Sequence, residues 1–142
     1  MVPRPVTPAS PRTSEAAPSF EQAVTGVASA AVLVRNLVEA HLNSWGMDAL
    51  VDDAVLVADE LFANAAQAAP GQVIGLRVVL LAAFVLIEVE DPSPKRAAHR
   101  EPDDEGGRGL MIVEALSAYW GQRPERGGTK TVYALLAIPR SA

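Results

Sequence analysis

Residues 106–121 read GGRGLMIVEALSAYWG, and this stretch is the most informative part of the chain. Its glycines lead into an apolar segment, 110–118, whose pattern predicts a helix. Glycines let a backbone approach an anion closely, and the free N–H groups of the following helical turn then point at it. Arg108 could add a charge-assisted contact to a phosphate. The stretch fits either an anion-binding loop or a flexible linker, and it matches neither common phosphate fingerprint.

Two helices and two strands are predicted before this stretch. Apolar residues recur every three or four positions over 27–45, and Gly46 ends that helix. A second helix is predicted to start at an N-cap, Asp48, and to run to about residue 69. Strands are predicted at 73–80, 84–90, 119–123 and 131–138, with a long polar loop over 91–109. The order α-α-β-β-loop-α-β-β predicts an α+β two-layer sandwich, with helices on one face of a mostly antiparallel mixed sheet.

The composition fits one domain and excludes several kinds of chemistry. The 142 residues carry a net charge of −5, which argues against nucleic acid or an anionic membrane as the main partner. There is no cysteine, so disulfides, thiolate-bound metals and thiol catalysis are excluded. Residues 1–19 are rich in proline, and we expect a disordered tail before a domain over 20–142. No apolar run is long enough to span a membrane, so we expect a soluble, cytoplasmic protein.

Glu60 and Asn64 are the first candidate site residues. They are four positions apart, so they share one face of the second predicted helix, among apolar neighbours. A carboxylate and a carboxamide in apolar company need partners, and oxygen ligands suit a hard cation such as Mg²⁺. The carboxylate could instead orient or deprotonate a hydroxyl. Simple solvent exposure on an amphipathic helix is the alternative interpretation.

Asp91 and Thr131 are candidates at strand ends. Asp91 directly follows an apolar strand, where its carboxylate can accept a hydrogen bond from an exocyclic amine such as that of adenine. The sequence Asp91-Pro92 also fits the start of a turn. Thr131 enters the last predicted strand after Gly127-Gly128, where it can either pack like a valine or hydrogen-bond a ligand.

Taken in order, these segments resemble the GHKL ATP-binding superfamily. The resemblance covers residues 25 to 138 and depends on DELFANA (59–65), Asp91, GGRGL (106–110) and KTVY (130–133). It is closest to the single-domain bacterial anti-sigma-factor serine/threonine kinases and their ATP-binding relatives. The implied fold is the Bergerat sandwich, with an additional strand expected between residues 20 and 25.

The resemblance implies a role for each candidate residue. Glu60 would be the catalytic base or water-orienting group, and Asn64 would coordinate Mg²⁺. Asp91 would bind the adenine amine, and Thr131 would lie near the base. The lid over the phosphates would be formed by Gly107, Arg108, Gly109 and Leu110.

The resemblance also implies a function and a set of partners. The expected activity is ATP-dependent phosphoryl transfer to a serine or threonine of a partner protein, with ATP and Mg²⁺ as cofactors. The partner would be a sigma factor, an anti-sigma antagonist or both, and a homodimer is a further expectation. A non-catalytic, ATP-gated interaction module is the alternative. The chain departs from the family pattern at Ala68, where relatives usually have histidine, and at Asp91-Pro92-Ser93-Pro94.

Overall fold

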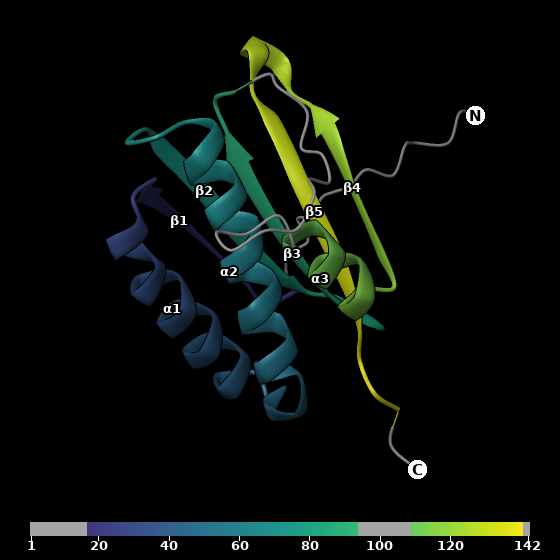
Figure 1. Ribbon diagram of the computed structural model, residues 1–142. Helices are drawn as coiled ribbons and strands as arrows, with labels where there is room; N and C mark the ends of the chain where they lie inside the picture. Colours follow the sequence, from purple (N-terminus) through teal and green to yellow (C-terminus); the bar gives the residue numbers. More distant parts are fainter. Residues whose placement is uncertain (1–16, 94–108, 141–142) are drawn as a thin grey trace, which may run out of the picture.

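The computed structural model describes residues 17–93 and 109–140. Helices lie across one face of a twisted sheet (Figure 1). The described strands and α-helices, in chain order, are β1 (Ser19–Thr25), α1 (Ala31–Ser44), α2 (Val51–Ala68), β2 (Val73–Leu80), β3 (Phe84–Asp91), α3 (Gly109–Leu116), β4 (Tyr119–Pro124) and β5 (Lys130–Ala137). The predicted α+β two-layer sandwich is confirmed.

The sheet has the strand order β1-β2-β3-β5-β4, and every described pair of strands is antiparallel. The hairpin predicted between β2 and β3 forms although its turn lacks glycine and asparagine, and Leu81 N–H donates to the carbonyl of Phe84 at 2.8 Å. The longer connection from β3 to β5 carries α3 and β4. This arrangement makes β3 a central strand, so the residues at its end are enclosed by neighbours on both sides.

Alternation along the strands gives the sheet two different faces. The inner face is apolar and packs under the helices to form the core, with Ile74, Val78, Ile87, Val132 and Ala134 at 3% exposure or less. Helix α2 is buried over the largest surface, because Ala54, Val57, Ala58, Leu61, Phe62 and Ala65 all face this core. The outer face carries charged side chains and has no helix over it in the described residues.

Two expectations about helix and strand boundaries need correction. Asp48 is not the N-cap of α2, because a 3-10 turn (Asp48–Leu50) precedes that helix and Leu50 takes the cap position without a side-chain hydrogen bond. Strand β1 starts at Ser19, inside the segment predicted as a tail, and Leu80 N–H donates to the carbonyl of Pro18 at 2.9 Å. The rest of the predicted tail, residues 1–16, lies outside the described residues.

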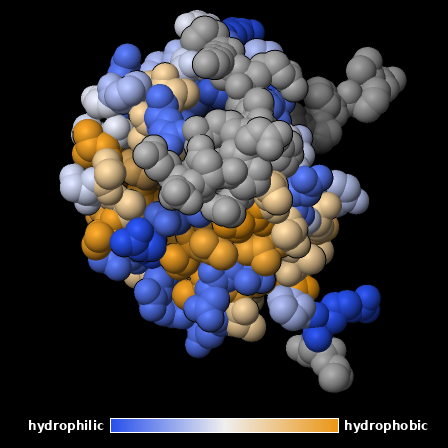
Figure 2. Space-filling view, viewed as in Figure 1, coloured by the Kyte–Doolittle hydropathy of each residue, from blue (hydrophilic) through white to orange (hydrophobic). Residues whose placement is uncertain are grey.

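The helix layer leaves some apolar surface in contact with solvent. Figure 2 shows hydrophobic residues between hydrophilic ones on this side of the molecule. The large exposed hydrophobic side chains on the helices are Val32, Leu33, Leu56 and Met111. Among the described residues, no helix is both long and apolar enough to cross a membrane.

Candidate functional site

The topology brings three segments to the same end of the sandwich. A short connection joins the C-terminal end of α2 to the start of β2, and β3 runs antiparallel to β2, so Asp91 lies near that end. Strand β5 starts beside it, because Asp91 pairs with Lys130 in the antiparallel register. Helix α3 packs against α2 (Figure 1). The candidate residues of α2, α3 and β3 thus belong to one side of the sheet, the helix-covered side.

Glu60 lies half-buried on α2, one turn before Asn64. Burial raises the pKa of the Glu60 carboxyl above its ordinary value of 4.5, and the neighbouring negative charge of Asp59 raises the pKa further. Asp59 itself pairs with Arg35 of α1, with 3.1 Å between Oδ1 and Nη1. A carboxylate with a raised pKa is a stronger proton acceptor once it is ionised, which suits a general base.

The N-terminus of α3 sits directly against Glu60. A Cβ atom placed on Gly109, the first residue of α3, would lie 2.8 Å from Glu60 Oε1. Any residue other than glycine would therefore push the carboxylate from its position. Leu110 follows as a buried anchor at 5% exposure, which holds α3 on the core. At Gly109 the missing side chain thus leaves the space that the Glu60 carboxylate occupies.

Asn64 is half-buried on the same helix face. Its side chain forms no hydrogen bond with any residue of 17–93 or 109–140. These described parts hold no cluster of three or more His, Asp or Glu side chains that could enclose a metal. Mg²⁺ in nucleotide sites commonly takes one or two protein oxygens and completes its coordination shell with phosphate and water, and a single amide oxygen fits that requirement. Asn64 Oδ1 is the oxygen that α2 offers for this purpose.

Asp91 is buried, at 1% exposure, and its carboxylate is already engaged. Lys130 Nζ donates to Oδ1 at 3.0 Å and to Oδ2 at 2.9 Å. The backbone N–H of Ser93 also donates to Oδ1, at 2.8 Å. Lys130 was not among the predicted site residues. A lysine at the start of an otherwise apolar strand was the signal for it, since lysine is rarely buried without a partner.

Thr131 is not brought to this site. In the register of β3 and β5 it lies opposite Glu90, whereas Asp91 lies opposite Lys130. Successive residues of a strand point to opposite faces, so Thr131 belongs to the outer face of the sheet. There it lines a hollow of about 460 Å³ together with Arg77, Glu88 and Arg123. The residue of β5 that meets Asp91 is Lys130.

The remaining predicted residues, Gly107 and Arg108, lie outside the described residues, as does Gly106. Only Gly109 and Leu110 of the predicted phosphate lid can be placed. The geometry therefore supports a site formed by Glu60, Asn64 and the N-terminus of α3, with Asp91 at the end of β3 and Lys130 at the start of β5. This combination of a helix-borne carboxylate and amide with a buried strand-end aspartate is compatible with a nucleotide site.

Comparison with known proteins agrees with this class of fold. The family model described as "Histidine kinase-like ATPase domain" matches residues 26–133, so the chain belongs to this family of ATPase-like domains. The superfamily identified from the sequence motifs is therefore confirmed. Membership in an ATPase-like family implies a nucleotide-binding domain.

One solved structure shows the same fold in more detail. The chain is similar to the crystal structure of the RsbU and RsbW domains of Rv1364c from Mycobacterium tuberculosis, with a TM-score of 0.68 and 21% sequence identity. The match covers 88% of this chain but about a third (34%) of that longer one. At this identity the likeness shows a shared fold. A comparison with curated protein sequences gives no match.

Proposed function

We propose that this chain binds Mg·ATP and transfers the γ-phosphoryl group to a serine or threonine hydroxyl of a partner protein. The observation that carries the proposal is Glu60, a half-buried carboxylate with a raised pKa that lies against Gly109 at the N-terminus of α3. A general base must be ionised near neutral pH, strongly basic and held in place. Burial and the neighbouring Asp59 raise the pKa of Glu60 and so its basicity, and the close approach of α3 restricts its position.

Each residue has a separate role in this proposal. Bound Mg·ATP would supply the phosphoryl group and the charge that neutralises its oxygens. Asn64 would hold the metal through its amide oxygen, and Asp91 would accept a hydrogen bond from the adenine amine. Glu60 would take the proton of the attacking hydroxyl as the new O–P bond forms and ADP leaves. The N-terminal N–H groups of α3 would face the phosphates.

The transfer experiment should use Mg²⁺, labelled ATP and candidate partner proteins, namely sigma factors and anti-sigma antagonists. We expect transfer by the wild-type chain and at least a ~100-fold loss in Glu60→Gln, since general bases contribute about 10²–10⁴-fold. Glu39→Gln is the matched control, because Glu39 is an exposed glutamate of α1. Equal transfer by Glu60→Gln and wild type would reject the catalytic role.

A second candidate function is an ATP-gated interaction module without catalysis. The exposed apolar side chains on the helix layer, including Val32, Leu33 and Met111, support a protein partner on this side. In this case Asn64→Ala should abolish binding of both ATP and partner, whereas Glu60→Gln should leave partner binding unchanged. Partner binding that is the same with and without nucleotide would reject this function.

A further inference from the structure

We propose that Lys130 is a positioning residue for base recognition: it fixes the Asp91 carboxylate so that one free acceptor position on Oδ2 selects a purine with an exocyclic amine. The inference rests on the proposed nucleotide function. It goes beyond it by assigning the base selectivity to an ion pair rather than to an isolated aspartate. Lys130 and Asp91 face each other across β5 and β3.

The ammonium group of Lys130 is fully used in this arrangement. Its Nζ donates to Asp91 Oδ1, to Asp91 Oδ2 and, at 3.3 Å, to the backbone carbonyl of Ser93. An ammonium group has three N–H donors, so none remains for a ligand. Lys130 therefore acts on a base through Asp91 and does not contact the base itself.

Within residues 17–93 and 109–140, the carboxylate of Asp91 is only partly used. Oδ1 accepts two hydrogen bonds, from Lys130 and from the N–H of Ser93. Oδ2 accepts one within the described residues, from Lys130. A carboxylate oxygen has about two lone-pair positions, so Oδ2 keeps one acceptor for an N–H group. A free acceptor beside a lysine with no free donor favours a ligand that donates at this point, as the amine of adenine does.

Burial makes the position of this carboxylate dependent on its two neighbours. The side chains of Lys130 and Asp91 are 6% and 1% exposed, so bulk water does not orient them. Lys130 supplies two of the three hydrogen bonds that hold the carboxylate. Without the ammonium group, the carboxylate keeps one hydrogen bond, from Ser93, and can turn about χ2. The acceptor on Oδ2 then loses its fixed direction.

The test compares two nucleotides by calorimetry in Mg²⁺: ATP and purine riboside triphosphate, which lacks the 6-amino group. We expect wild type to prefer ATP by about 10-fold or more, the size of one hydrogen bond to a charged group. In Lys130→Met the preference should fall to about 3-fold or less, while Lys130→Arg should keep most of it. Arg123→Met is the control, because it removes two ion pairs on the opposite face of the sheet.

The outcomes separate this inference from the proposed function. If wild type binds neither nucleotide, both the proposed function and the role of Lys130 are rejected. If wild type binds ATP without preferring it, or if folded Lys130→Met keeps the full preference, the role of Lys130 is rejected and nucleotide binding stands. Lys130→Gln is the second variant if Lys130→Met does not fold. A loss of the preference for ATP in Lys130→Met, but not in Arg123→Met, supports the inference. A purely structural role of Lys130 would lower the affinity for both nucleotides equally.

Discussion

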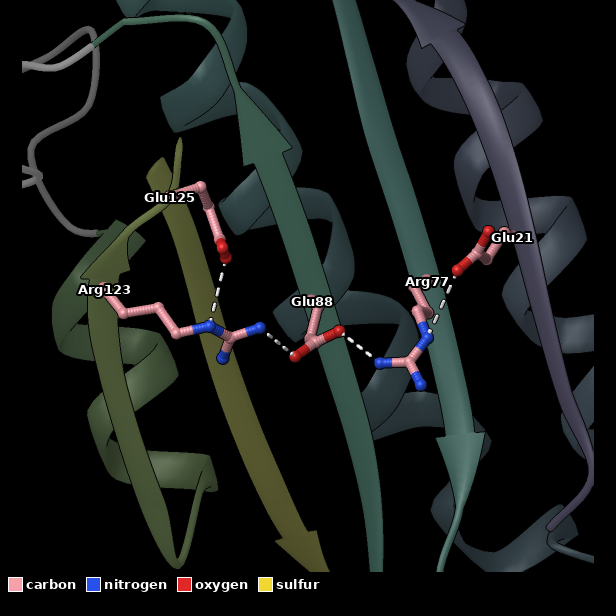
Figure 3. A network of polar contacts seen from close by, with 5 residues as sticks. All are labelled: Glu21, Arg77, Glu88, Arg123 and Glu125. Atoms are coloured by element: carbon pink, nitrogen blue, oxygen red, sulfur yellow. Dashed lines mark hydrogen bonds and ion pairs between the residues drawn. The ribbon is translucent and has the colours of Figure 1, made fainter. Parts of the chain in front are cut away.

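The two faces of the sheet carry charged side chains in opposite physical settings. On the helix-covered face, Lys130 and Asp91 form one ion pair at 6% and 1% exposure. On the open face, a chain of ion pairs runs across the sheet, linking Glu21, Arg77, Glu88, Arg123 and Glu125 (Figure 3). The arginines of this chain are 39% and 47% exposed, whereas Glu88 between them is 10% exposed and keeps two arginine partners.

The difference shows where charge matters most in this molecule. Exposed ion pairs are screened by water and salt, and each is worth about 0–1 kcal/mol. A buried charge that loses its partner is far more costly, because neither water nor another group replaces the lost interaction. The exposed arginines of the open face therefore tolerate changes that the covered ion pair does not, and the proposed site lies entirely on the covered face.

The strongest test of this contrast is Asp91→Asn. We expect it to lower the free energy of unfolding by about 3–5 kcal/mol, because it leaves the Lys130 ammonium buried without a counter-charge. Arg123→Met on the open face should cost about 1 kcal/mol or less. Urea denaturation measures both. The double variant Asp91→Asn/Lys130→Met should recover much of the loss, and equal costs for the two single variants would contradict the contrast.

The expected instability also affects how ligand binding is tested. Loss of ATP binding in Asp91→Asn would not by itself identify Asp91 as the base-binding group, since a partly unfolded chain binds nothing. Lys130→Met leaves the Asp91 carboxylate unpaired and carries a similar cost, so the test uses the ratio of two nucleotides in folded protein, with Lys130→Arg as the variant that keeps the charge. At the covered face, a substitution is therefore informative about ligand binding only where the variant is shown to be folded.

A second prediction concerns Gly109→Ala, which changes the covered face without removing a charge. The new Cβ would lie 2.8 Å from Glu60 Oε1, at the end of a side chain that can move, so stability should change by less than about 1 kcal/mol. Phosphoryl transfer should fall by about 10- to 100-fold, because the displaced base no longer meets the hydroxyl. Kinetic assays and urea denaturation on the same preparation separate the effect on phosphoryl transfer from the effect on stability.

Gly75→Ala is the matched control for this prediction. A Cβ on Gly75 of β2 would meet Glu90 at 3.7 Å, an ordinary contact, and it lies on the open face. We expect this variant to keep wild-type transfer. Full activity in Gly109→Ala would show that Glu60 does not need its observed position, and the catalytic proposal would lose its main support.

The sequence predicted the elements of the fold better than their edges. Helix α2 and strands β2 and β3 follow directly from apolar spacing, because each buries a regularly spaced set of apolar residues in the core. Strand β1 is an edge strand in which only Val24 is buried, so it shows little hydrophobic alternation. The Asp48 cap was wrong because a 3-10 turn, which has no clear sequence signal, precedes α2.

The site was predictable in its residue types but not in its pairings. Glu60 and Asn64 share a helix face by their spacing alone. Which residue of β5 meets Asp91 depends on the register between two strands, and a shift of one residue exchanges Thr131 for Lys130. The contact between Gly109 and Glu60 depends on how α3 packs on α2, which local sequence does not determine.

The smallest expected effect concerns the ion pair between Arg35 and Asp59, in which the exposure of Asp59 is intermediate between that of the covered pair and that of the open-face arginines. The transfer rate should rise with pH as Glu60 ionises, with a midpoint above 4.5, because burial and Asp59 both raise the pKa of Glu60. Asp59→Asn removes the charge effect and should lower this midpoint, while burial keeps it above 4.5. Arg35→Ala leaves the charge of Asp59 without its partner and should raise the midpoint.

The pH–rate profile of each variant measures this effect, with Asp52→Asn, an exposed aspartate early in α2, as the control. High salt should reduce the difference between Asp59→Asn and wild type, because the Asp59–Arg35 pair is 30% and 42% exposed and accessible to screening. A shift that persists in high salt would mean that Asp59 acts on Glu60 through the protein interior. In that case Asp59, although its side chain is 30% exposed, would behave like a buried charge of the covered face.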